Sequence, residues 1–129
     1  MEFLIGFLGD QGYECEIREW DGGNEARLRV TFETEDEDVI FVSVLCFDDL
    51  VILRAIAEEQ IGYSSASLEY VNNINQLYWD YRFTVDEDGD MMIERARALE
   101  EHWPVFITAP TIVNEIKLLC ECCMELRSE

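Results

Sequence analysis

The amino-acid sequence predicts an α+β domain, in which an antiparallel sheet of five or six strands is flanked by helices. Apolar and polar residues alternate with a period of two over several short segments, as in half-buried strands. Two pairs of these segments are joined by glycine-containing turns of the kind that close antiparallel hairpins. Other segments place apolar residues three or four positions apart, which is the spacing of a helix face. The length of 129 residues fits a single domain over residues 1–129.

The N-terminal part of the chain is predicted to form a helix and a hairpin. Residues 2–8 are mostly apolar and precede Gly9, which favours a short helix. Residues 13–18 and 26–33 alternate between apolar and polar side chains, and Gly22-Gly23 between them suits a tight turn. This turn sets a register in which apolar residues face each other and acids face bases. The expected pairs are Ile17 with Leu28 and Glu16 with Arg29.

Two apolar segments follow, and the first is predicted to be a strand with two buried faces. The acidic residues 33–38 form the preceding turn, and residues 39–47 are then apolar except for one serine. One face of this strand packs on the core, and the other needs a helix or another subunit to cover it. That second face consists of Ile40, Val42, Val44 and Cys46. Residues 50–57 are rich in β-branched side chains, which favours a strand, whereas Asp49 as a cap favours a helix. The strand is the preferred prediction.

A helix and a second hairpin are predicted next. Residues 64–67 include three serines, which cap helices well, so a helix is expected from there to about Tyr78. Residues 81–85 alternate in polarity and lead to an acidic turn that contains Gly89. A three-residue loop with Gly89 in the left-handed conformation matches the facing side chains better than a two-residue turn. It pairs Phe83 with Ile93, Val85 with Met91 and Arg82 with Glu94.

The last predicted element is a long helix from Pro110 to about Leu126, after a connection over residues 100–109. Apolar residues repeat in it at spacings of four and three, and others widen this stripe. A helix with so wide an apolar face packs against the sheet, a partner subunit or both. The expected order of elements is α-β-β-β-(β)-α-β-β-α. We expect a partner or dimer interface that includes Ile40, Val42, Val44, Ile112, Ile116, Leu119 and Cys123.

The charge balance and the cysteines limit the classes of partner and the compartment. The chain holds 29 acidic and 9 basic residues, a formal net charge of −20. Such a surface repels nucleic acid and anionic lipid, so neither is an expected partner. The N-terminus lacks the positive charge of a signal peptide, and no apolar run has the length of a membrane span. Five cysteines, three of them at residues 120–123, do not resemble a secreted disulfide framework, so a cytoplasmic location is expected.

Three groups of residues suggest chemistry at first sight, and each has a simpler interpretation. The acids of residues 86–90 lack the glycine and acid spacing of a calcium loop, so a solvated hairpin turn is preferred. The thiols of residues 120–123 cannot converge on a metal ion from one helix, because Cys122 points away from the other two. No ligand spacing or nucleophile partner involves His102. We therefore predict no catalytic residue, no metal and no cofactor.

One stretch of the chain carries a recognisable series of motifs. Residues 70–75 read Tyr-Val-Asn-Asn-Ile-Asn, residues 81–86 read Tyr-Arg-Phe-Thr-Val-Asp, and an acidic-glycine turn follows. Over residues 64–97 this order resembles the YbjN-like family, whose members are labelled bacterial sensory transduction regulators. The resemblance implies a fold similar to type III secretion chaperones, which are small, acidic, cytosolic dimers that bind proteins and catalyse nothing. It also marks Asn72 and Asn75, on one face of the helix, as a family signature.

The expected function is therefore that of a non-enzymatic protein-binding module, chaperone-like or regulatory, which acts as an acidic cytosolic homodimer in a bacterium. The twin subunit would cover excess apolar surface, and the acidic exterior would keep the assembly soluble. The alternative is an acidic inhibitor of the immunity type, a decoy that blocks a basic site on a partner protein. The decoy predicts one tight basic partner and binding that weakens steeply with salt. The sequence does not identify the client.

Overall fold

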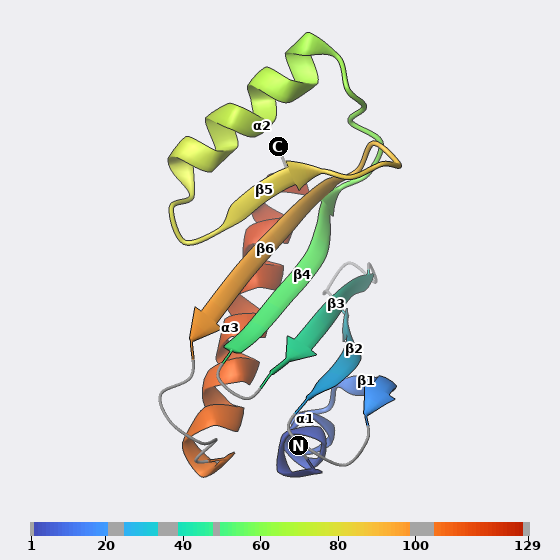
Figure 1. Cartoon of the computed structure of the whole chain (residues 1–129), viewed down its shortest axis with the longest axis vertical. Helices are drawn as coiled ribbons and strands as arrows, with labels where there is room; N and C mark the ends of the chain where they lie inside the picture. The colour runs from blue at the N-terminus through green and yellow to red at the C-terminus, as the bar shows by residue number, and fades with distance from the viewer. Residues whose placement is uncertain (1, 21–24, 34–38, 48–49, 99–104, 128–129) are drawn as a thin grey trace.

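One antiparallel sheet of six strands organises the described part of the chain, and three helices pack around it (Figure 1). The computed structural model describes residues 2–20, 25–33, 39–47, 50–98 and 105–127. The helices are α1 (Glu2–Asp10), α2 (Ser65–Leu77) and α3 (Val105–Arg127). The strands are β1 (Glu14–Trp20), β2 (Ala26–Glu33), β3 (Val39–Cys46), β4 (Leu50–Glu58), β5 (Arg82–Val85) and β6 (Met91–Ala98). The predicted fold class and order of elements are confirmed, with residues 50–57 in a strand.

The strands lie in the order β1-β2-β3-β4-β6-β5, and every neighbouring pair is antiparallel. The predicted pairs Ile17–Leu28, Glu16–Arg29, Phe83–Ile93, Val85–Met91 and Arg82–Glu94 are all present. A β-bulge shifts the register of β1 between Ile17 and Glu19, which the alternation of residues did not reveal. The predicted turns at residues 21–24 and 34–38 lie outside the described residues.

The hairpin of β5 and β6 closes through a three-residue loop, as predicted. Gly89 has a φ of +81°, the left-handed conformation that glycine adopts without strain. The Asp86 N–H donates to the Asp90 carbonyl with an N···O distance of 3.0 Å. The Gly62 N–H also donates to the Gly89 carbonyl at 3.0 Å, so the connection from β4 to α2 is tied to this loop.

Helices α1 and α3 cover one face of the sheet (Figure 1). Helix α3 packs on β4 and β6, and α1 packs against α3 and β1. Because successive strand residues point to opposite faces, the even-numbered residues of β3 lie together on the covered face. The core formed there includes Leu4, Leu8, Leu28, Val30, Met91 and Ile93, all fully buried.

The seven residues expected to form a partner interface belong to this core. Ile40, Val42, Val44, Ile112, Ile116, Leu119 and Cys123 are each at most 2 % exposed within one chain. The expectation that they contact a partner is therefore corrected, because α3 and the sheet already cover one another's apolar stripes. The second face of residues 39–47 is at most 1 % exposed within one chain, so no second subunit is needed to cover it.

Helix α3 begins at Val105, five residues before the predicted start. The predicted connection over residues 100–109 is thus helical from residue 105, while residues 99–104 lie outside the described part. Pro110 lies inside α3 and has no N–H to donate to the carbonyl four residues earlier, and the helix nevertheless continues through it. No helix among the described residues is long and apolar enough to cross a membrane.

Candidate functional site

The sheet face turned away from α1 and α3 carries no helix among the described residues (Figure 1). Large apolar side chains nevertheless lie on it: Phe41 is 50 % exposed and Phe47 is 40 % exposed. Apolar side chains that gather on an uncovered surface mark interaction sites. We call this surface the open face, and its centre consists of Arg29, Phe41, Leu45, Phe47, Ile52 and Arg54.

A row of charged and polar side chains crosses the open face from one edge of the sheet to the other. Strand pairing aligns one residue from each strand, in the order Glu16, Arg29, Ser43, Arg54, Glu94 and Arg82. We call these six residues the charge row. Arg29 Nη2 lies 3.2 Å from Glu16 Oε2, and Arg54 Nη2 lies 2.7 Å from Glu94 Oε2. Arg82, at the β5 end, makes no ion pair with any residue that the structure describes.

Arg29 also joins the charge row to the apolar part of the open face. Its Cζ lies 4.6 Å from the centroid of the Phe41 ring, which is a cation–π contact. Its Nε is buried and has no hydrogen-bond acceptor among the described residues. A buried donor without an acceptor costs free energy, so the single chain leaves the centre of the open face incompletely satisfied.

The open face gathers the basic residues of a strongly acidic chain. Five of the nine basic residues lie on it, namely Arg18, Arg27, Arg29, Arg54 and Arg82. Strand alternation places five acids there as well: Glu14, Glu16, Glu19, Glu33 and Glu94. Among these ten strand residues the basic and acidic charges balance, although the chain as a whole has a formal net charge of −20. A partner therefore meets less repulsion along these strands than the net charge of the chain would suggest.

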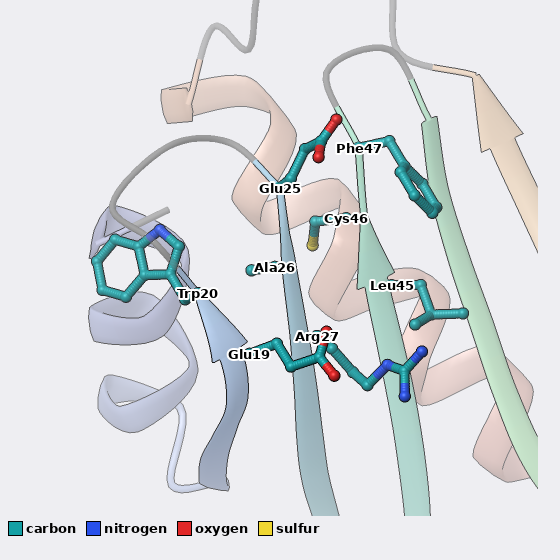
Figure 2. Close-up of a pocket in the computed structure, with 8 residues that line it drawn as sticks. All are labelled: Glu19, Trp20, Glu25, Ala26, Arg27, Leu45, Cys46 and Phe47. Carbon is teal, nitrogen blue, oxygen red and sulfur yellow. The ribbon is translucent and has the colours of Figure 1, made fainter.

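A hollow of about 410 Å³ lies at one corner of the open face, where β1, β2 and β3 end (Figure 2). Its lining mixes acidic, basic and apolar side chains: Glu19, Trp20, Glu25, Ala26, Arg27, Leu45, Cys46 and Phe47. Burial raises the pKa of the Cys46 thiol to about 12, so this thiol is protonated at neutral pH and is a poor nucleophile. The hollow therefore suits an inserted side chain better than a reaction.

The two signature asparagines lie on α2, beside the free edge of β5 (Figure 1). The Asn75 side chain forms two hydrogen bonds with the backbone of Phe83 in this edge strand. Its Nδ2 donates to the Phe83 carbonyl at 2.9 Å, and its Oδ1 accepts the Phe83 N–H at 2.8 Å. Asn72 is exposed. Asn75 thus takes the place that a neighbouring strand would occupy, which blunts an edge that would otherwise pair with other chains.

Two of the three acids of the β5–β6 loop, Asp86 and Asp90, hold the loop together through their carboxylates. The ligand atoms of all three acids lie within 4.8 Å of one another. Asp86 Oδ1 accepts the backbone N–H groups of Asp88 and Asp90, both at 3.0 Å. Asp90 Oδ1 accepts the N–H of Gln60 at 2.8 Å. These hydrogen bonds give the two acids a structural role: they hold the β5–β6 loop in shape and attach it to the connection from β4 to α2.

The three cysteines near the end of α3 are all buried. Cys122 is 6 % exposed, and Cys120 and Cys123 are fully buried. Burial raises the pKa of Cys122 to about 11 and that of Cys123 to about 12. Burial, followed by the neighbouring Cys122, raises the pKa of Tyr81 to about 12. Because Cys122 is buried as well as Cys120 and Cys123, α3 is enclosed here over more of its circumference than a helix with one buried face.

An ion cluster that the sequence did not reveal attaches α3 to β6. Glu115 is 8 % exposed. Its Oε2 lies 2.5 Å from Arg95 Nε, and its Oε1 lies 2.7 Å from Arg97 Nη1. The one available signal was that Arg95 and Arg97 continue the buried alternation of β6, where apolar residues would be expected. A buried acid with two arginines positions a helix and is not arranged for chemistry.

A family model with the description "Putative bacterial sensory transduction regulator", that of the YbjN family, matches residues 2–103. This range contains α1, α2 and the described strands, and therefore the whole open face, whereas α3 begins after it. A search of curated proteins finds no match to the chain.

Proposed function

The chain belongs to the YbjN family, and on that premise we propose that it is a regulatory protein that binds other proteins through the open face and catalyses no reaction. The proposal includes a cytoplasmic location and a homodimeric state. The description of the family as a regulator, not as an enzyme, supports the first part of it. The free thiols of all five cysteines fit a reducing compartment.

The observation that carries the proposal is the contrast between the two faces of one sheet. Helices seal one face, and the other leaves Phe41 and Phe47 in contact with solvent beside the charge row, which holds three arginines and two glutamates. Protein interfaces have this composition, with apolar anchors at the centre and polar groups that set the register. A protein partner would bury both phenylalanines and supply acceptors for the arginines between them.

The state of the titratable side chains also supports binding over catalysis. The groups with raised pKa values are thiols and phenols, and burial is the main cause in each. A raised pKa keeps a thiol protonated at neutral pH, which makes it a weaker nucleophile. We therefore assign these thiols and phenols to the packing of the protein interior and not to catalysis.

Site-specific photo-crosslinking in the source cells tests the proposal. A photoreactive phenylalanine analogue replaces Phe41 on the open face, and in a matched control it replaces Leu118, which is 44 % exposed on α3. We expect covalent adducts with protein from position 41, identified by mass spectrometry, and few or none from position 118. When the crosslinking is repeated in cell lysate, the yield from position 41 should be retained at moderate salt, because apolar contacts are not screened.

Equal yields from the two positions, or adducts from position 118 alone, would contradict the proposal. Adducts at position 41 with one strongly basic protein, which no longer form when a lysate is irradiated at moderate salt, would instead identify the acidic decoy. The mass of the adduct also separates a second copy of this chain from another protein.

A further inference from the structure

The open face is complementary to itself, and we propose that a second copy of this chain covers it in the free protein. The two copies would be related by a two-fold axis that runs parallel to the strands, between β3 and β4. This inference rests on the proposed function, since it names the first protein that the open face binds. It also gives that function a form of regulation, because self-association and partner binding compete for one surface.

The strand order determines which side chains meet. Rotation about such an axis reverses the order of the strands but keeps each position along them, so β1 lies over the partner's β5, β2 over the partner's β6 and β3 over the partner's β4. The charge row then meets its own copy in reverse order. Glu16 faces the partner's Arg82, and Arg29 faces the partner's Glu94. Two-fold symmetry makes each of these contacts twice.

The row of residues next to the charge row, which includes Leu45 and Ile52, supports the same arrangement. Leu45 and Ile52 are paired across β3 and β4, so the rotation places Leu45 opposite the partner's Ile52. Apolar side chains thus meet apolar side chains, and charges meet opposite charges. An axis perpendicular to the strands would instead place each strand over its own copy, with Arg29 near the partner's Arg29, which is unfavourable.

Arg82 favours the first arrangement further. It is exposed and makes no ion pair with any described residue of its own chain, although Glu94 is its cross-strand neighbour. The carboxylate of Glu94 is engaged by Arg54 instead. The partner's Glu16 would supply the missing counter-charge for Arg82, and the balanced charges of the open-face strands lessen the repulsion between two copies of charge −20.

A charge-reversal cycle measured by sedimentation equilibrium tests the inference on the full chain. The variants are Glu16→Arg, Arg82→Glu and the double variant that carries both. Each single variant should weaken the dimer by roughly tenfold or more, because each puts like charges opposite one another twice per dimer. The double variant restores opposite charges and should regain most of the wild-type affinity.

Two controls make the same changes of charge on the far side of the molecule, at exposed positions of α3: Glu121→Arg and Lys117→Glu. Neither should change the affinity of the dimer by as much as the matching reversal on the open face. Thermal unfolding of every variant shows whether the fold is retained, and the double variant keeps the test valid if one single variant unfolds.

Three results would overturn the inference: a monomer at about 100 µM protein, a dimer that neither single reversal weakens, or single losses that the double variant fails to recover. In any of these cases, crosslinks from position 41 to a different protein would leave standing the part of the proposed function that assigns the open face to binding other proteins. If crosslinks to a different protein are absent as well, both the inference and the proposed function are contradicted.

Discussion

Asn75 shows how one side chain can complete a sheet. A strand at the edge of a sheet leaves N–H and C=O groups that invite pairing with other chains. The amide of Asn75 supplies one donor and one acceptor, and both contact the backbone of Phe83. Phe83 itself is 2 % exposed and packs its ring edge-on against Tyr78, so the same contact holds α2 against the core. The signature asparagine therefore has a structural role that its type alone did not specify.

Replacement of Asn75 by alanine should lower the free energy of unfolding by about 1–2 kcal/mol, because two hydrogen bonds to a half-buried strand are lost. The matched control is Asn73→Ala, at an exposed position of the same helix, which should change stability by less than about 0.5 kcal/mol. Urea denaturation at equilibrium measures both values. Equal losses of unfolding free energy in the two variants would show that the two hydrogen bonds between Asn75 and Phe83 contribute nothing to stability.

Helix α3 is held to the sheet by three kinds of contact. Its apolar stripe fills the covered face, with Ile116 and Leu119 fully buried. Glu115 binds two arginines of β6 near the middle of the helix. At its C-terminal end, Arg127 Nη2 donates to the Ile56 carbonyl at 2.9 Å, next to the bulge of β4. The bulge interrupts the ladder there, so the arginine satisfies a carbonyl that lies beside irregular strand pairing.

Loss of the Glu115 carboxylate should cost more than loss of an exposed acid on the same helix. Glu115→Ala leaves Arg95 and Arg97 without their main acceptor, and we expect a loss of about 2–4 kcal/mol in unfolding free energy. Glu121→Ala, at an exposed position of α3, should cost less than about 0.5 kcal/mol. Denaturation curves of the two variants give the comparison, and a loss at position 115 no larger than at position 121 would contradict the account.

Alkaline pH should destabilise the fold through the buried thiols. Burial raises the pKa of Cys46 and Cys123 from 9.0 to about 12 in the folded chain. Below pH 9 both states keep these protons, so the thiols add no pH dependence. Above pH 9 the unfolded chain releases them and the folded chain does not, so stability falls by up to about 1.4 kcal/mol per pH unit for each thiol.

Urea midpoints measured at pH 8, 9 and 10 should therefore be level at first and then decline. Cys46→Ala should make the decline shallower, because one titrating group is removed. A midpoint that stays constant up to pH 10 would mean that the thiols are not enclosed as the structure places them.

The strand residues of the open face carry balanced charges, although the chain as a whole is strongly acidic. Two bodies of charge −20 with centres about 30 Å apart repel by tens of kcal/mol in salt-free water. At about 0.15 M salt the Debye length is about 8 Å, and most of this repulsion is screened. The ion pairs that we propose between two open faces would lie at contact distance. Salt would therefore screen them less than it screens the long-range repulsion.

The dimer should therefore strengthen when the ionic strength rises from about 10 mM to about 150 mM, as the Debye length falls from about 30 Å to about 8 Å. Light scattering after size-exclusion chromatography gives the mass at each salt concentration. A mass that falls towards 15.1 kDa over this range would contradict the expected balance, because it would mean that ion pairs dominate the association.

The sequence specified most of the elements because alternation and turn residues act locally. Residues 26–33 and the β5–β6 hairpin carry a clear period of two, and their registers were predicted from facing side chains. The early start of α3 was missed because Pro110 was taken to mark its first turn, whereas the helix continues through it although a proline has no N–H to donate. The bulge in β1 left no local signal.

The functional face could not be assigned from the sequence for a specific reason. Residues 39–47 are apolar on both sides of the strand, so alternation did not distinguish the side that α3 covers from the side that stays open. The prediction placed the interface on Val42 and Val44, whereas the structure buries them and exposes Phe41. The charge row was beyond reach as well, because it exists only when all six strands are aligned.

The central claim, that the open face binds protein, is tested most directly by hydroxyl-radical footprinting. Oxidation of Phe41 and Phe47 is compared with that of Tyr63 and Trp79, which are exposed outside the open face, in the source cells and in dilute purified protein. The account predicts that both phenylalanines are protected in cells by several-fold, while Tyr63 and Trp79 react equally in the two samples. Phenylalanines as reactive in cells as in dilute solution would contradict it.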